Sequence, residues 1–148
     1  MPDPAVSRWK QNGLAAFWRE PKSDHWNLTA DDECCRSLIE LIDLMQNAQW
    51  SSRAQVSLTM PDRTANGDVA GAKFAKSIEI CYPKDQVGRE HWEIRSDQNL
   101  SLEIGFDRLF ELRSVVNDIR VGNGDYSIGS DANPLWVWWW VNSPNDGG

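Results

Sequence analysis

The most strongly patterned stretch of the chain is an uncharged run near the C-terminus, Leu135–Val141, which holds four of the nine tryptophans. Seven apolar residues are too few for a membrane span, which needs about 20, and their β-branched and aromatic character favours a strand. Because side chains alternate between the two faces of a strand, two rows are expected. The row expected in the core comprises Leu135, Val137, Trp139 and Val141. The opposite row, called the tryptophan row below, comprises Trp136, Trp138 and Trp140.

Four earlier segments alternate apolar and polar residues with the two-residue period of a strand. They cover residues 54–60, 76–82, 91–95 and 100–106. The last two are joined by the short polar loop 96–99, which predicts a hairpin. A further short strand is expected over residues 124–129. Because each of the four segments has one apolar and one polar side, the pattern predicts an antiparallel meander with one face toward water.

Two segments have the period of a helix. The first runs from Thr29, the expected N-cap, to about Ala48, and its wide apolar arc predicts a helix that is mostly buried. The acidic run 31–33 is expected to stabilise the helix dipole rather than to bind a metal, because three consecutive residues point in different directions. The second helix is expected to be capped by Asp107 and to stop at Gly122, where glycine suits the left-handed conformation.

The order of these elements, α-β-β-β-β-α-β-β, predicts an α+β two-layer sandwich, with one antiparallel sheet of about six strands and the helices on one face. A length of 148 residues suits a single domain spanning 1–148. Residues 1–30 are expected to form an irregular segment that packs on the sheet through Trp9, Phe17, Trp18 and Trp26. Residues 142–148 are polar and glycine-rich, and we expect them to be a disordered tail.

The formal net charge of -7 argues against a nucleic-acid partner, because phosphates attract a basic surface. No membrane association is expected either. The N-terminus has neither the basic start nor the apolar core of a signal peptide, which predicts a cytoplasmic protein whose three cysteines are free thiols. Cys34 and Cys35 lie on the apolar side of the first predicted helix, where cysteine usually acts as a small hydrophobe.

Candidate catalytic groups are few. His91 and Glu93 share the polar side of one predicted strand, and Cys81 faces the same way on another, so an acid–base pair and a thiol–imidazole nucleophile are the two candidate arrangements. Nothing in the local sequence orients these groups, and charge pairing on a solvated sheet is far commoner. The other histidine is His25, and no four-ligand zinc spacing exists. We therefore predict no catalytic residue, no metal site and no cofactor.

The glycine-rich segment 122–129 follows a helix and leads into a strand, which is the reverse of a phosphate-binding loop. We interpret it as a helix cap followed by a turn.

These features predict a non-enzymatic intracellular binding module that engages another protein, of the inhibitor, immunity or accessory type, by analogy of composition rather than of motif. The expected binding residues are the tryptophan row, because monomers seldom leave a wide apolar strip bare. Either residues 1–30 fold across this row, or the row binds a protein partner or a second copy in a homodimer. The alternative is a small-molecule or carbohydrate-binding protein that uses the tryptophans as a stacking platform. An enzyme built around His91 and Cys81 is the least favoured function.

Overall fold

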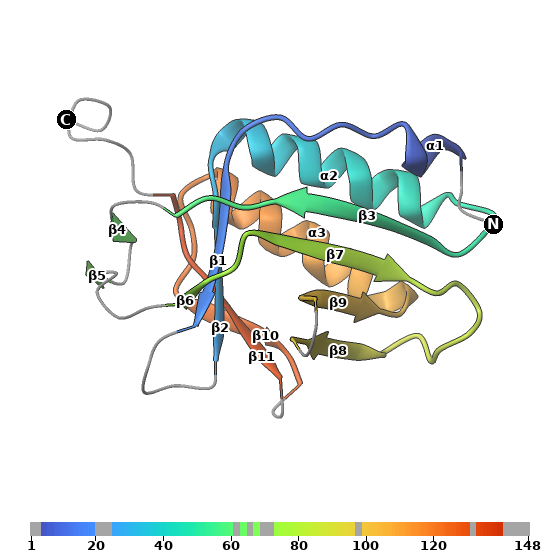
Figure 1. The fold of residues 1–148 in the computed structure, drawn as a ribbon. Coiled ribbons are helices and arrows are strands. Elements are labelled where there is room, and N and C mark those ends of the chain that lie inside the picture. The colour runs from blue at the N-terminus through green and yellow to red at the C-terminus, as the bar shows by residue number, and fades with distance from the viewer. Residues whose placement is uncertain are drawn as a thin grey trace.

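The computed structural model describes residues 4–19, 25–60, 63–64, 67–68, 73–96, 99–130 and 133–140. Its described strands form a five-stranded sheet, a four-stranded sheet and a two-stranded pair, and two 15-residue helices pack beside them (Figure 1). The α+β class predicted from the sequence is therefore confirmed. The expectation of one antiparallel sheet of about six strands is wrong, because the strands divide between two sheets that are both mixed.

The five-stranded sheet has the strand order β10-β11-β2-β1-β6. Its members are β1 (Ala15–Arg19), β2 (Trp26–Ala30), β6 (Lys73–Phe74), β10 (Tyr126–Gly129) and β11 (Pro134–Val137). β11 runs parallel to β2, whereas the other neighbours are antiparallel. Strands from the two ends of the described chain therefore lie next to each other in one sheet.

Residues 1–30 were expected to be irregular. For the described part of this segment that prediction is wrong, because β1 and β2 form an antiparallel hairpin within the five-stranded sheet. A short helix, α1 (Pro4–Ser7), precedes them. Four consecutive residues of β1, Ala15 to Trp18, are each at most 1% exposed, so both faces of this strand are covered. A strand buried on both faces lacks the apolar–polar alternation that identified the other strands.

The four-stranded sheet has the order β3-β7-β9-β8. Its members are β3 (Ser52–Ser57), β7 (Ser77–Tyr82), β8 (Trp92–Arg95) and β9 (Ser101–Ile104). The predicted β8–β9 hairpin is confirmed, but the meander is wrong, because β9 lies parallel to β7 and β8 forms the sheet edge. Alternation indicates which face a side chain occupies and does not determine which strands are neighbours. The remaining described strands, β4 (Arg63–Thr64) and β5 (Gly67–Asp68), pair only with each other.

The two long helices are α2 (Asp32–Gln46) and α3 (Phe106–Arg120). The N-cap of α2 is Asp31 and not Thr29, because the Asp31 side chain accepts the Cys34 backbone N–H at 2.8 Å while Thr29 belongs to β2. The N-cap of α3 is Gly105, so the expected cap, Asp107, lies instead in the first turn. The predicted end of this helix is confirmed, since Gly122 has a φ of +88°.

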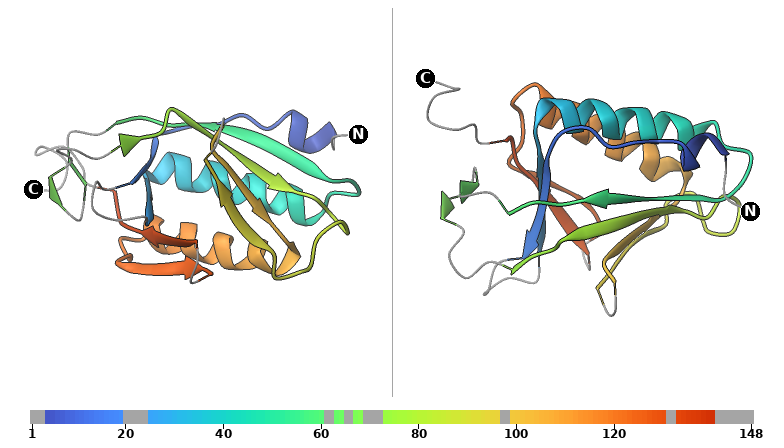
Figure 2. Two further views of the ribbon diagram at one scale, coloured as in Figure 1. Left: turned by 60° about the horizontal axis from the view of Figure 1, so that its bottom comes forward. Right: turned by 45° about the horizontal axis from the view of Figure 1, so that its top comes forward.

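One hydrophobic core lies between the helix pair and the apolar faces of both sheets. In the two views of Figure 2 the helices lie side by side, with the four-stranded sheet along them and the five-stranded sheet toward one end. The apolar side of α2 enters this core through Leu38, Leu41, Ile42 and Met45, as its periodicity predicts. Within the residues that the structure describes, no helix has the length and apolarity of a transmembrane segment.

Candidate functional site

Strand β11 is shorter than the sequence pattern predicts. It ends at Val137, the following residues 138–140 are outside regular secondary structure, and Val141 lies outside the described residues. Leu135 and Val137 are fully buried, as expected for the core row. Trp139 was expected beside them but is 38% exposed, so its placement in the core is wrong. Side-chain alternation no longer holds once the strand has ended.

The tryptophan row begins in the five-stranded sheet with Trp136 of β11 and continues past the end of that strand. In the strand register Trp136 lies beside Asn27 of β2, and Asn27 lies beside Trp18 of β1. Trp138 continues along β2, because its backbone N–H donates to the Leu28 carbonyl at 3.0 Å and its indole N–H donates to Asn27 Oδ1 at 2.9 Å. The rings of Trp136 and Trp138 are nearly parallel, with centroids 6.3 Å apart and planes at 23°.

This face of the five-stranded sheet is more enclosed than the sequence suggests. Trp18 and Asn27 are both buried, and the Trp18 ring stacks on Phe74 of β6 with a centroid separation of 5.6 Å. The β4–β5 pair lies on the side of the sheet away from the helices (Figure 1, Figure 2). The three members of the tryptophan row, Trp136, Trp138 and Trp140, are half-buried.

The described aromatic residues of the N-terminal segment lie beside or behind the tryptophan row and not across it. Phe17 and Trp26 pack toward the core, with ring centroids 5.1 Å apart. Trp9 packs at α2, where its indole N–H donates to the Ser37 carbonyl at 2.8 Å. Trp18 shares the face of the row but stands two strands away in the same sheet. The aromatic side chains of residues 4–19 and 25–30 therefore do not cover the tryptophan row.

A second group of chemically active side chains lies on the polar face of the four-stranded sheet. Glu93 of β8 is the register partner of Glu103 of β9, and Glu103 is the partner of Cys81 of β7. His91, just before β8, places Nε2 3.0 Å from Glu103 Oε1. The candidate pair of His91 and Cys81 is thus separated by Glu103. The sequence showed that Glu103 is on the polar side of its strand but not that it stands between these two groups.

The Cys81 thiol is poorly suited to nucleophilic attack. Burial, together with the nearby carboxylates of Glu79 and Glu103, raises the pKa of this thiol to about 12. Its Sγ also donates to Glu79 Oε1 at 3.4 Å. Because the thiolate is the nucleophile, a thiol held protonated at neutral pH gives no support to an enzyme built on His91 and Cys81.

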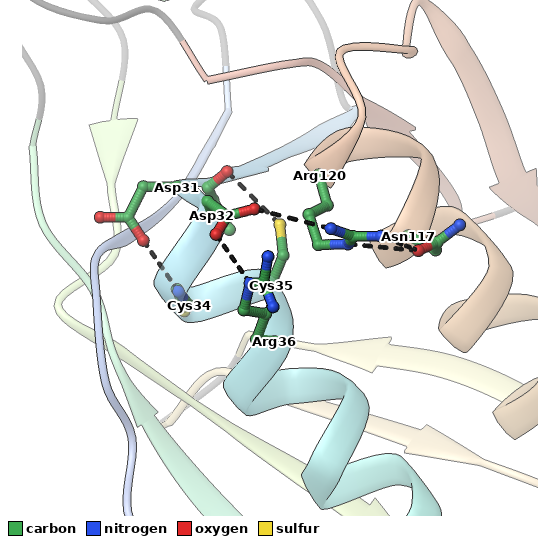
Figure 3. Close-up of polar contacts among 8 residues, drawn as sticks. Asp31, Asp32, Cys34, Cys35, Arg36, Asn117 and Arg120 are labelled. Atoms are coloured by element: carbon green, nitrogen blue, oxygen red, sulfur yellow. Dashed lines mark hydrogen bonds and ion pairs between the residues drawn. The ribbon is translucent and has the colours of Figure 1, made fainter.

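The other two cysteines lie at the start of α2, where Figure 3 shows the surrounding polar contacts. Burial raises the pKa of both Cys34 and Cys35 to about 12, and Cys35 Sγ donates to the Ala30 carbonyl at 3.5 Å. The acidic residues here have structural partners: Asp31 caps the helix, and Asp32 accepts from Arg36 at 2.8 Å. These contacts fit the predicted role of the acidic run at the helix N-terminus and the predicted role of the cysteines as packing residues.

No protein-family model matches this sequence, and no curated protein sequence matches it.

Proposed function

We propose that the protein is a non-enzymatic binding module whose contact surface for another protein is formed by Trp136, Trp138, Trp139 and Trp140, called the tryptophan surface below. The observation that carries this proposal is the position of Trp139, which is 38% exposed immediately after two stacked indoles at the end of β11. Tryptophan is strongly enriched among the residues that dominate protein–protein binding energy. One exposed indole beside three half-buried ones gives a contiguous apolar surface, and such surfaces on a monomer are typical of interaction sites.

The rigidity of Trp138 supports this function. Two hydrogen bonds hold it, one from its backbone to Leu28 and one from its indole to Asn27. The ring of Trp139 in turn meets the ring of Trp138 edge-on, with centroids 6.4 Å apart and planes at 61°. Side chains that are already ordered lose little conformational entropy on binding, so more of the contact energy appears as affinity.

The charge of the chain indicates the kind of partner. Asp125 borders the tryptophan surface, because its backbone N–H donates to the Val137 carbonyl at 2.7 Å. Asp125 is exposed. The whole chain carries a net charge of -7. A protein with an apolar pocket rimmed by basic residues would match this surface, since opposite potentials speed association and exclude like-charged competitors.

A carbohydrate or other small ring-shaped ligand is the second candidate. It is favoured by one observation, the near-parallel orientation of the Trp136 and Trp138 rings, since aromatic faces provide stacking platforms for apolar ligand faces.

The test compares two exposed tryptophans. Trp50 is 52% exposed and follows the end of α2, whereas Trp138 bonds to β2 just before α2 begins. The two sites are therefore separated by roughly the 22 Å length of a 15-residue helix. The full chain and its Trp139→Ser and Trp50→Ser variants are used to capture partners from the cells that make the protein. The captured partner is then purified and its affinity for each variant is measured.

The proposal predicts a stoichiometric protein partner that binds Trp139→Ser at least tenfold more weakly than wild type and binds Trp50→Ser with unchanged affinity. Equal affinity for both variants would contradict a protein contact at the tryptophan surface. Saturable quenching of tryptophan fluorescence by a soluble glycan, abolished by Trp136→Ser and unaffected by Trp50→Ser, would instead favour the second candidate.

A further inference from the structure

A separate site lies on the polar face of the four-stranded sheet. His91, Glu93 and Glu103 each offer one ligand atom, and these three atoms all lie within 4.8 Å of one another. Among the residues that the structure describes, this is the one such group of three or more acidic, histidine or cysteine side chains. We propose that His91, Glu93 and Glu103 together bind one divalent transition-metal ion, for which Zn²⁺ has the matching chemistry.

The electrostatics of the site favour a cation independently of the ligand spacing. Glu93 and Glu103 are direct partners across the β8–β9 hairpin, and like charges at directly opposed positions destabilise a sheet. Arg95 contacts Glu93 from one side at 2.7 Å. Glu79 adds a third carboxylate on the same face, beside Ser101 of β9. A divalent ion between Glu93 and Glu103 would convert their repulsion into two attractive contacts.

The backbone holds the imidazole in place. The His91 N–H donates to the Gly88 carbonyl at 3.1 Å, and the Gly105 N–H donates to the His91 carbonyl at 2.9 Å. A Cβ at position 105 would lie 2.1 Å from Gly88 O, so this close approach requires glycine. The start of β8 is thus fixed against the chain that leads into α3, and the His91 ring is presented to Glu103. A ligand carried by a fixed backbone needs little rearrangement to bind an ion.

The separations suit one shared ion. Zn²⁺ bonds of about 2.0–2.2 Å in a tetrahedral sphere place neighbouring ligand atoms about 3.4 Å apart. His91 Nε2 and Glu103 Oε1 are 3.0 Å apart, and the Glu93 ligand atom lies within 4.8 Å of both, so a small adjustment of these side chains would be needed for all three to bind one ion. Arg95 donates to one oxygen of Glu93, which leaves the second oxygen for the ion. Such outer contacts orient ligating carboxylates in metal sites.

The donor set selects the class of ion. One imidazole nitrogen with two carboxylate oxygens suits Zn²⁺ and similar first-row ions, whereas Mg²⁺ and Ca²⁺ prefer oxygen ligands alone. The side chains of His91 and Glu103 are 29% and 26% exposed, so water can reach the ion and complete its coordination sphere. Three protein ligands with an open position are compatible with a bound water or with a ligand atom from another molecule.

The experiment uses the full chain, stripped with a chelator and exchanged into metal-free buffer. Zn²⁺ is titrated by calorimetry, and the metal content after gel filtration is measured by mass spectrometry. We expect one Zn²⁺ per chain, with affinity reduced at least tenfold by His91→Gln and by Glu93→Gln. His25→Gln removes the other histidine and Cys81→Ser removes the nearest thiol, and both are expected to leave the affinity unchanged. Excess Mg²⁺ is expected not to displace Zn²⁺.

A second measurement keeps the proposal testable if His91→Gln does not fold. In the wild-type chain, Zn²⁺ is expected to shift the ring nitrogen resonances of His91 and not those of His25. Three results would overturn the proposal: no saturable binding, binding that persists in a folded His91→Gln variant, or loss of binding in Cys81→Ser. None of these results bears on the tryptophan surface, which lies on the other sheet.

Discussion

The indole N–H of Trp138 donates a hydrogen bond of 2.9 Å to the side-chain oxygen of Asn27, a residue 111 positions earlier in the chain. Asn27 is itself 4% exposed, and its amide nitrogen donates to the Trp18 carbonyl at 3.3 Å. One buried amide thus joins three adjacent strands or their extensions, β1, β2 and the end of β11. This bond also orients an indole of the tryptophan surface.

Replacing Trp138 with phenylalanine tests this bond. The substitution keeps an aromatic ring but leaves the buried Asn27 oxygen without its indole donor, which costs about 1–3 kcal/mol. We therefore expect Trp138→Phe to lower the free energy of unfolding in urea by that amount. The exposed neighbour provides the control, since Trp139→Phe is expected to change stability by no more than about 0.5 kcal/mol. Equal losses in the two variants would show that the Asn27 bond contributes little.

The start of α2 offers a test that distinguishes the observed cap from the one expected from the sequence. Asp31→Ala removes the acceptor for the Cys34 N–H and is expected to cost about 0.5–2 kcal/mol. Thr29 Oγ1 is buried and has no hydrogen-bond partner in the structure as described. Thr29→Val replaces this hydroxyl with a methyl group of similar shape, so it is expected to be neutral or stabilising. Urea unfolding of both variants checks this, and a larger loss in Thr29→Val would mean that the cap is misassigned.

The raised thiol pKa values predict a loss of stability in alkali. Burial raises the pKa of Cys34 and Cys35 from 9.0 to about 12 in the folded chain. Above pH 9.0 the unfolded chain therefore loses thiol protons before the folded chain does. The protonated thiols therefore contribute fully to the free energy of unfolding below pH 9.0, the pKa of the unfolded chain. This contribution is lost as the pH rises toward the folded-state pKa of about 12.

Urea unfolding measured from pH 7 to pH 11 in the presence of a reductant is expected to show this decline in the free energy of unfolding. Cys35→Ala should flatten the decline, even where it lowers the stability at neutral pH. A slope that does not change in this variant would mean that other groups, among them Tyr126 with its raised pKa beside Asp118, cause the alkaline loss.

Helices and strands with a clear apolar–polar period were predictable from the sequence, but which strands pair with each other was not. The apolar face of α2 and the alternation in β7 and β9 appear in the structure where the pattern placed them. The parallel pairing of β7 with β9 has no counterpart in the local sequence, because pairing depends on which hairpin inserts beside which strand. Residues 138–140 continued the strand pattern in sequence, yet the strand stops at Val137.

The candidate sites show the same division. From residue type and period alone, the sequence predicts the tryptophan row as a binding surface, but it predicts no metal site at His91 and Glu93. It missed Trp139 as an exposed residue, since the end of a strand within an unbroken apolar run has no sequence marker. It also placed no special role on Glu103, because only the register of β9 between β7 and β8 brings this carboxylate to His91 and Glu93.

Two glycines with similar positive φ angles allow the cost of backbone strain to be measured separately from the cost of a steric clash. Gly122 and Gly129 have φ values of +88° and +97°, but a Cβ at Gly122 would meet nothing within 4 Å, whereas a Cβ at Gly129 would lie 2.3 Å from Trp92 Nε1. Trp92 is buried, and its indole N–H donates to the Asn133 carbonyl at 2.7 Å. Gly122→Ala is therefore expected to cost only the left-handed strain of about 1–2 kcal/mol. Gly129→Ala must also displace the Trp92 ring, which adds about 1–3 kcal/mol. The difference between the two unfolding free energies measures this contact, and a difference near zero would mean that the β10–β11 turn does not rest on Trp92.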